Sequence, residues 1–254
     1  MLYNYQPQPI AGKGVVISGG TTGLGRAMAI RLAGAGAKVL IFGRNAEPLD
    51  EALADIQQAA DAGGGQVFGI TADHGNLADV ARVFAEADAK LGTVNILINN
   101  AAVAAESIAE TPIEEAESVL RSNLLGYLAC TAQAIPRMKA AKDGHIINIG
   151  SMSAHEREAG SDIYVATKGA VEAWSESLHK QISKDGLKVC LIEPGLVGSD
   201  MTVDKVPVPE QPAAIAAEKM LHAEDLAECV YYVVTQPHRV NLSMIRIEPR
   251  NPES

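Results

Sequence analysis

Two side chains in the second half of the chain could move a proton together. Tyr164 and Lys168 lie four residues apart in a segment with a helical pattern, so both side chains would lie on one helix face. A free tyrosine titrates at about 10, and a neighbouring ammonium group would lower that value toward neutral pH. By itself, the pair is also compatible with a packed aromatic residue beside an unrelated lysine.

A glycine-rich segment near the start of the chain could hold phosphate groups. Gly19, Gly23 and Gly25 follow the apolar run 14–18 and lead directly into a segment with a helical pattern. Glycines allow a tight turn and close approach to a ligand, and the N-terminus of a helix supplies N–H donors. A turn without a ligand is the alternative, but a place between a first strand and a helix is typical of a dinucleotide site.

Strands and helices alternate along the chain and would position these motifs. Short apolar runs predict buried strands at 14–18, 38–42, 66–71, 94–98, 145–149, 187–192 and 243–247. Helical patterns cover 24–35, 47–62, 76–91 with Asn76 as cap, 113–139 with a break near Pro136, 162–183 and 223–235. Such repeated units require a parallel sheet covered on both faces. We therefore predict one doubly wound α/β domain over residues 1–254, in three α/β/α layers. It would have an N-terminal arm at 1–12 and a proline-rich substrate lid at about 198–220.

The glycine segment, Ser-Gly-Gly-Thr-Thr-Gly-Leu-Gly at 18–25, is similar to the TGxxxGxG motif of the short-chain dehydrogenase/reductase family. Residues 99–102 resemble that family's NNAG motif with Ala102 in place of glycine, and residues 194–199 resemble PGxVxT with Ser199 in place of threonine. The resemblance covers nearly the whole chain. It implies a Rossmann-type fold with a seven-stranded sheet, and hydride transfer between a nicotinamide cofactor and a small alcohol or carbonyl substrate.

The same resemblance implies a catalytic tetrad of Asn123, Ser151, Tyr164 and Lys168. Tyr164 would protonate the oxygen of the reduced carbonyl, while Lys168 would lower the pKa of Tyr164 and hold the nicotinamide ribose. Ser151 would orient the substrate oxygen, and Asn123 would hold a water that links Lys168 to solvent. Ser151 as a turn residue and Asn123 at a helix kink are the alternatives.

Cofactor contacts are implied at the carboxyl ends of the strands. The expected residues are Gly19, Thr21, Thr22, Gly23, Leu24, Gly25, Arg44, Asn45, Asp73, His74, Asn99, Asn100, Ala101, Tyr164, Lys168, Pro194, Gly195, Val197 and Ser199. Asp73 matches the family's adenine contact, and Asn99 should lie over the adenosine half. The segment from Pro194 to Ser199 should hold the nicotinamide carboxamide.

The residues after the second strand favour NADP(H), with NAD(H) as the alternative. Gly43 stands where NAD-dependent relatives carry an aspartate, and Arg44 follows it. A guanidinium group fits a 2′-phosphate, although Arg44 could instead be a solvated surface residue. Thr21 stands where some NADP-dependent relatives carry a second basic residue, so Arg44 has no obvious second cation beside it.

The substrate region carries less information. Residues 153–158 include two acids, His155 and Arg157, which suggest either a polar mouth or a solvated loop. The segments that begin at Met220, Gln236 and Ile245 are similar to a subgroup with NADP-dependent 3-hydroxy-acid dehydrogenases, serine dehydrogenases and carbonyl reductases. This similarity implies small polar substrates, and members of the family are usually homotetramers or homodimers.

Composition excludes several other classes of protein. A net charge of -10 disfavours binding to nucleic acids and anionic membranes, and no apolar run reaches membrane-spanning length. Widely spaced cysteines without CxxC, dispersed histidines and a polar start favour a cytoplasmic protein without a metal site. Two other functions stay open: an epimerase or dehydratase with bound cofactor, and a non-catalytic cofactor sensor. The complete tetrad argues against the sensor.

Overall fold

A seven-stranded parallel sheet forms the centre of the computed structural model, which describes residues 5–203 and 205–252. Its order is β3-β2-β1-β4-β5-β6-β7. The strands are β1 (Gly14–Ser18), β2 (Lys38–Gly43), β3 (Gln66–Thr71), β4 (Ile96–Asn99), β5 (His145–Ile149), β6 (Lys188–Pro194) and β7 (Met244–Ile247). The strand order reverses between β1 and β4, where a doubly wound sheet leaves a crevice at the carboxyl ends of its strands. The predicted fold class is confirmed.

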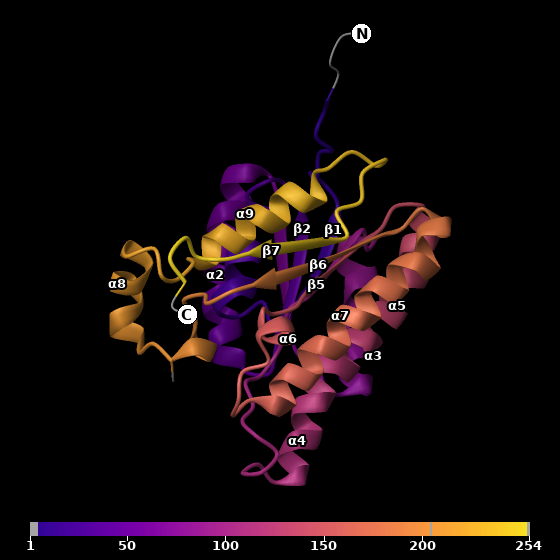
Figure 1. The fold of residues 1–254 in the computed structure, drawn as a ribbon. Coiled ribbons are helices and arrows are strands. Elements are labelled where there is room, and N and C mark those ends of the chain that lie inside the picture. Colours follow the sequence, from indigo (N-terminus) through magenta and orange to yellow (C-terminus); the bar gives the residue numbers. More distant parts are fainter. Residues whose placement is uncertain (1–4, 204, 253–254) are drawn as a thin grey trace.

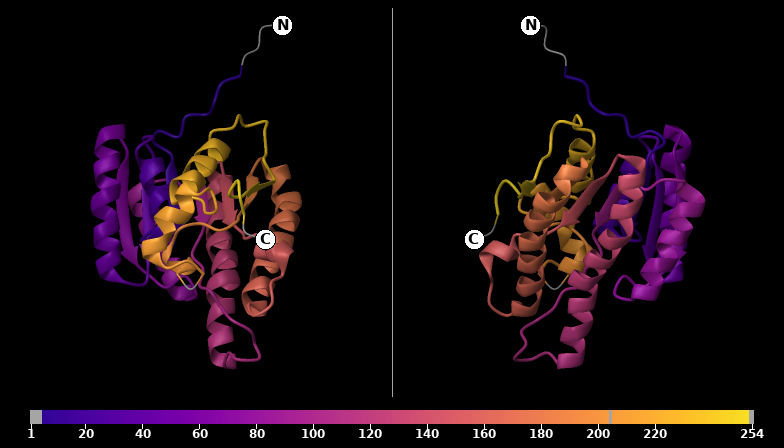
Figure 2. Two further views of the ribbon diagram at one scale, coloured as in Figure 1. Left: turned by 60° about the vertical axis from the view of Figure 1, so that its left-hand side comes forward. Right: turned by 90° about the vertical axis from the view of Figure 1, so that its right-hand side faces the viewer.

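Helices cover both faces of the sheet (Figures 1 and 2). One layer consists of α1 (Gly23–Ala33), α2 (Ala46–Gly63) and α9 (Ala223–Val234), and the other of α3 (Leu77–Leu91), α5 (Gly126–Ala141) and α7 (Asp162–Ile182). Val15 and Ile17 of β1 pack into the first layer, whereas Val16 packs into the second. Both faces of the central strands are therefore buried, which explains their continuous apolar sequences.

The long helical stretch predicted at 113–139 is irregular at a different place from the one expected. α4 (Ile113–Leu120), a π-helical turn (Arg121–Leu125) and α5 follow one another directly, and Pro136 lies inside α5 without ending it. The break expected near Pro136 is therefore wrong. Pro136 and Ala132, whose carbonyl loses its helical donor, are both exposed, so that carbonyl lies on the solvent side of the helix.

The π-helical turn contains Asn123, whose side chain bonds to the segment that follows β4. Asn123, in the π-helical turn, accepts a hydrogen bond from the backbone N–H of Val103 at 2.8 Å and donates one to the Val103 carbonyl at 2.9 Å. π-helical turns occur often at functional sites. Here the turn fixes the position of the segment that follows β4.

Two short helical turns and one helix form most of the predicted lid. They are Asp200–Thr202, Val208–Glu210 and α8 (Gln211–Ala216), while Asp204 lies outside the described residues, as do residues 1–4 of the predicted arm. The segment after β7 runs toward α8 (Figure 1), and the backbone N–H of Asn251 donates to the Glu218 carbonyl at 2.9 Å. In the described part of the chain, every helix is too short or too polar to cross a membrane.

Candidate active site

A cavity of about 980 Å³ extends along the carboxyl ends of the strands. Most of the predicted site residues line it: Gly19, Thr21, Thr22, Gly23, Leu24, Arg44, Asn45, Asp73, His74, Asn100, Ala101, Ser151, Tyr164, Lys168, Pro194, Gly195, Val197 and Ser199. Gly25, Asn99 and Asn123 do not line it. The predicted cofactor residues and the predicted proton-transfer residues therefore share one cavity.

The turn after β1 is held against the turn after β4. The Ser18 hydroxyl accepts hydrogen bonds from the backbone N–H groups of Asn100 and Ala101, both at 3.0 Å. The side-chain amide of Asn100 donates to the carbonyls of Ser18 and Gly19 at 3.0 and 3.1 Å. Gly19 has a φ of +63° and Gly23 a φ of +48°, a conformation that favours glycine. The N-terminus of α1 thus opens into the cavity behind a fixed glycine turn.

Gly25 and Asn99, which do not line the cavity, contact neighbouring parts of the chain, and their expected contacts with the cofactor stay predictions. A Cβ atom on Gly25 would lie 2.0 Å from the carbonyl oxygen of Gly19, so only glycine lets α1 approach the turn this closely. Asn99 is fully buried and donates to Thr131 at 3.1 Å and to Asn148 at 2.8 Å, which ties β4 to α5 and β5. Both residues support the cavity wall from behind.

At the end of β2, the Arg44 side chain is exposed, and Thr21 occupies the space into which a side chain at position 43 would extend. A Cβ atom on Gly43 would lie 2.8 Å from the Cγ2 methyl of Thr21, so a larger side chain at position 43 would displace Thr21. Arg44 is exposed, and within the described residues its guanidinium has no hydrogen bond or ion pair. The Arg44 guanidinium is therefore available to an anion at this end of the cavity.

Asp73 and His74 form the wall next to that end. The Asp73 carboxylate accepts from the backbone N–H of Gly75 at 2.9 Å and so shapes the turn before α3, where Asn76 provides the predicted cap. His74 is buried, its Nδ1 lies 3.1 Å from the Ser122 carbonyl, and burial lowers its pKa to about 4. The ring is therefore neutral at pH 7.

Ser151, Tyr164 and Lys168 converge at the other end of the cavity. Ser151 follows β5 after one residue, whereas Tyr164 and Lys168 lie one turn apart on α7. The Tyr164 hydroxyl is hydrogen-bonded to Ser151 and lies 4.0 Å from the sulfur of Met201 in the lid. The buried Lys168 ammonium donates to the Ile149 carbonyl at 2.8 Å, and its Nζ lies 5.6 Å from the centre of the Tyr164 ring.

The pKa values differ from the expectation that Lys168 makes Tyr164 more acidic. Burial raises the pKa of Tyr164 to about 12, although the hydrogen bond with Ser151 opposes this change. Burial also lowers the pKa of Lys168 to about 7, so its positive charge is only partly present at neutral pH. The expected acidification of Tyr164 is thus not found, because burial raises its pKa by more than the hydrogen bond with Ser151 lowers it.

Asn123 lies behind this wall. Besides its two bonds to Val103, its side chain donates to the Thr167 hydroxyl at 3.4 Å, and Thr167 in turn donates to the carbonyl of Tyr164 at 2.7 Å. These contacts connect the segment after β4 with the turn of α7 that carries Tyr164. The water expected between Asn123 and Lys168 stays a prediction.

Several residues that line the cavity were not predicted from the sequence. They lie in the segment after β4 (Val103, Glu106, Glu110, Thr111), in α4 (Glu115) and after β7 (Glu248, Pro249), whereas Met201 and Lys205 belong to the predicted lid. Their positions depend on how distant segments meet around the cavity.

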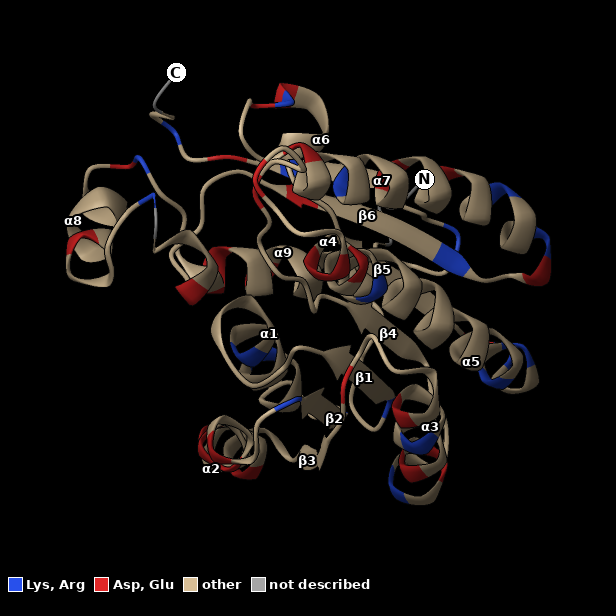
Figure 3. Cartoon of the chain, turned by 90° about the horizontal axis from the view of Figure 1, so that it is seen from below, with Lys and Arg blue, Asp and Glu red and all other residues tan. Residues whose placement is uncertain are grey.

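Ser153, Glu156 and Glu158 from the expected polar mouth also line the cavity, whereas His155 turns away toward Glu193 and Arg246. Figure 3 shows the acidic residues on α4 and α6 (Ser153–Glu156).

Comparisons with known proteins give consistent matches over most of the chain. A sequence model of a family described as short chain dehydrogenase matches residues 13–209. An uncharacterized oxidoreductase of Staphylococcus aureus (strain USA300) is 33% identical over 238 residues, which cover 93% of this chain and 97% of that protein. The closed form of a serine dehydrogenase complexed with NADP+ has a TM-score of 0.80 at 29% identity, covering 92% of this chain and 94% of the other. A blue fluorescent protein from a metagenomic library, in complex with NADPH, has a TM-score of 0.83 at 26% identity, with 95% and 98% covered.

The buried amine predicts a pH-dependent stability. Unfolded Lys168 keeps its ordinary pKa of 10.5 while the folded value is about 7, so the unfolded chain binds more protons between these values. The contribution of Lys168 to the free energy of unfolding therefore rises with pH between about 7 and 10.5. Below pH 7 the folded protein carries the whole destabilisation that comes from burying this charge. Lys168→Met should stabilise the cofactor-free protein by an amount on the order of a few kcal/mol at about pH 6, and by less as the pH rises.

Urea denaturation of both proteins between about pH 6 and 9.5 checks this expectation. Lys180→Met is the matched control, because Lys180 lies on the same helix in an exposed ion pair with Glu176. A stability difference between Lys168→Met and the wild type that does not change with pH would contradict the assigned pKa.

Proposed function

Because this chain belongs to the short-chain dehydrogenase/reductase family of oxidoreductases, we propose that it transfers a hydride between NADP(H) and a small alcohol or carbonyl substrate. The observation that carries the proposal is the placement of Ser151, Tyr164 and Lys168 in the same cavity as the glycine turn and Arg44. One end of this cavity suits a dinucleotide, and the other offers a proton donor beside the place where the substrate would lie.

The glycine turn and the end of β2 fit NADP(H). N–H groups at the start of α1 would hold the pyrophosphate, because Gly19 and Gly23 carry no side chain at this part of the cavity and Gly25 lets α1 approach the turn closely. The Arg44 guanidinium would hold the 2′-phosphate, and Thr21 fills the space above Gly43 where an acid would otherwise repel it. The solved structures of similar proteins with NADP+ and NADPH support this assignment.

The side chains at the reacting end suit protonation of a substrate oxygen. Bound NADPH would supply the hydride. The Ser151 hydroxyl accepts a hydrogen bond from the backbone N–H of Ser153 at 3.1 Å and is hydrogen-bonded to Tyr164, so both hydroxyls would lie beside the substrate oxygen. Tyr164, with its raised pKa, is protonated at neutral pH and would donate its proton to the same oxygen. Lys168, with a pKa of about 7, can accept and release a proton at the pH of the reaction.

Residues 198–220 would act as a lid over the substrate. Met201 lies against the Tyr164 hydroxyl, and the Gln211 amide donates to the Ser199 carbonyl at 3.1 Å, which ties α8 to the end of the cavity wall. The homodimer or homotetramer expected from the family stays a prediction.

Removal of the phenolic hydroxyl should stop the reaction without affecting cofactor binding. We expect Tyr164→Phe to lower kcat by about 100-fold or more, because general acid catalysis of this kind contributes roughly 10²–10⁴-fold. The affinity for NADPH should stay close to that of the wild type. Tyr232→Phe, at an exposed tyrosine of α9, is the control. Near-normal kcat in Tyr164→Phe would show that another group donates the proton.

Removal of the Arg44 guanidinium should weaken the binding of NADPH much more than the binding of NADH. We expect Arg44→Ala to weaken NADPH by roughly 10- to 150-fold, the value of a lost charge-assisted contact, and to leave NADH nearly unchanged. Arg239→Ala, at an exposed arginine between α9 and β7, is the control. Fluorescence titration with both reduced cofactors measures the effect. Equal affinities in the wild type, or tighter NADH, would assign Arg44 to the solvated surface.

A further inference from the structure

A buried carboxylate behind the Ser151 turn takes no part in the steps described above. Glu193 is the residue before Pro194 in β6, and its side chain is fully buried. Its Oε2 lies 2.9 Å from Nε2 of His155 and 3.1 Å from Nε of Arg246. A buried charge needs such partners, because an uncompensated carboxylate is strongly destabilising.

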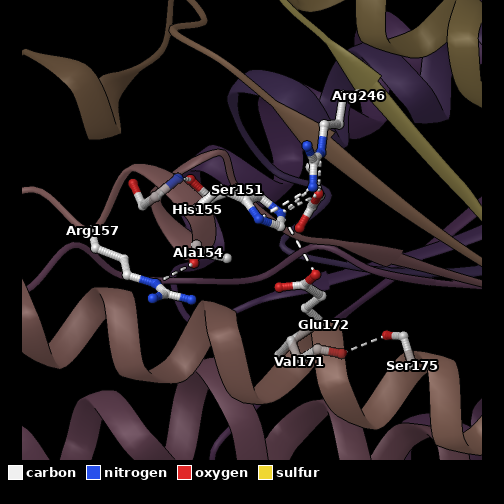
Figure 4. A network of polar contacts seen from close by, with 10 residues as sticks. Ser151, Ala154, His155, Arg157, Val171, Glu172, Ser175 and Arg246 are labelled. Carbon is white, nitrogen blue, oxygen red and sulfur yellow. Dashed lines mark hydrogen bonds and ion pairs between the residues drawn. The ribbon is translucent and has the colours of Figure 1, made fainter.

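The cluster around this carboxylate joins four elements of the cavity wall. His155 belongs to α6, which follows Ser151, and Arg246 belongs to β7, which leads to Glu248 and Pro249 in the cavity. Glu172 lies on α7, four and eight residues after Lys168 and Tyr164 and hence on the same side of that helix, with its Oε1 3.6 Å from Nε2 of His155. Figure 4 shows His155 between Arg246 and Glu172.

His155 contacts both of the other side chains through its ring. Its Nε2 lies 2.9 Å from Oε2 of Glu193 and 2.7 Å from Nη2 of Arg246, and Nδ1 lies 3.2 Å from the same Nη2, so the ring is held between the carboxylate and the guanidinium. Arg246 also donates directly to Glu193, so the three side chains form a closed triangle of polar contacts. Such a triangle resists rotation of the His155 ring and therefore displacement of α6.

The Ser151 turn rests directly on the strand that carries this carboxylate. The backbone N–H of Gly150 donates to the Ile192 carbonyl at 2.7 Å, and that of Met152 donates to the Pro194 carbonyl at 3.1 Å. A Cβ atom on Gly150 would lie 2.9 Å from Cγ of Glu193, so the Glu193 side chain packs against the residue next to Ser151. A change at Glu193 is thus transmitted to Ser151 through one residue.

A divalent cation is the other occupant that this set of side chains suggests. One ligand atom each from His155, Glu172 and Glu193 lies within 4.8 Å of the others. However, the guanidinium of Arg246 already contacts both Glu193 and His155, so the positive charge between these groups is supplied by the chain itself. The geometry therefore favours a positioning role over metal binding.

We propose that Glu193, His155 and Arg246 are positioning residues, which hold the Ser151 turn at its working distance from Tyr164. The proposal rests on the proposed function, in which Ser151 orients the substrate oxygen. It follows that loss of the cluster lowers kcat, because the Ser151 hydroxyl is no longer held in place. Binding of NADPH changes less than kcat, because the expected contacts of the glycine turn and Arg44 lie far from the cluster and only the contact expected at Pro194–Ser199 lies next to it.

The experiment compares Glu193→Gln, Arg246→Met and Arg246→Lys with Lys180→Met, a change at an exposed ion pair of α7. Glu193→Gln and Arg246→Met lower kcat by roughly 10- to 100-fold, the range expected when a reacting group is displaced by up to about 1 Å. The KM for NADPH stays within about twofold, and Arg246→Lys recovers part of kcat because the charge is kept. Lys180→Met behaves like the wild type.

Hydrogen–deuterium exchange of residues 150–158 in the cofactor-free proteins provides a readout that does not depend on turnover. Exchange in this segment is faster in Glu193→Gln and Arg246→Met than in Lys180→Met. The positioning role is overturned if exchange in Glu193→Gln and Arg246→Met equals that in the wild type. It is also overturned if the wild type is active and both variants keep its kcat. Absence of turnover in the wild type refutes the proposed function instead, and the exchange data still decide on the cluster. If Glu193→Gln fails to fold, the test is made with Arg246→Met, because the Arg246 side chain is partly exposed.

Discussion

The hydrogen bonds between the turns after β1 and β4 determine where a ligand can lie. At this point the strand order of the sheet reverses, and the two turns diverge to form the crevice. Ser18 and Asn100 hold the turns together through four hydrogen bonds, all of 3.0 or 3.1 Å. These bonds connect the glycine turn to the wall that follows β4 and so restrict the shape of the cavity. Such preorganisation reduces the ordering that binding would otherwise require.

Burial of ionisable groups is the second constraint on the site. Lys168 donates to the Ile149 carbonyl, which also accepts from the Tyr127 hydroxyl, so β5 is tied to two helices at one atom. The same burial brings the pKa of Lys168 to about 7 and raises that of Tyr164 to about 12. A protonated phenol beside a readily exchanged amine suits delivery of a proton to a substrate oxygen at neutral pH.

Features that depend on local sequence could be predicted. The strand at 66–71, the Asn76 cap and the glycine turn follow from apolar runs, capping chemistry and the lack of a Cβ atom, and all are present. Features that depend on tertiary packing could not be predicted in this way. The π-helical turn at Asn123 contains no glycine or proline to mark it, and the kink considered there as an alternative coincides with a bond to Val103, twenty residues earlier.

Buried polar residues show the same limit. Asn99 was expected to lie over the adenosine half of the cofactor, and in the structure its amide donates to Thr131 and Asn148 on neighbouring elements. His155 looked like part of a polar mouth, and it turns toward Glu193, a partner 38 residues away in the sequence. In each case the residue type was informative about polarity, whereas the direction of the side chain was set by partners that only the folded chain brings near.

Transfer of an isotopic label tests the central claim most directly. The wild-type protein would be mixed with NADPH carrying deuterium on the reactive carbon of the nicotinamide ring and with a panel of small aldehydes and ketones, and the products analysed by mass spectrometry and NMR. If the chain is a hydride-transferring oxidoreductase, one alcohol product carries deuterium on the carbinol carbon, and an equal amount of oxidised cofactor is formed. Tight binding of the cofactor with all deuterium retained on it, across the whole panel, would contradict this account.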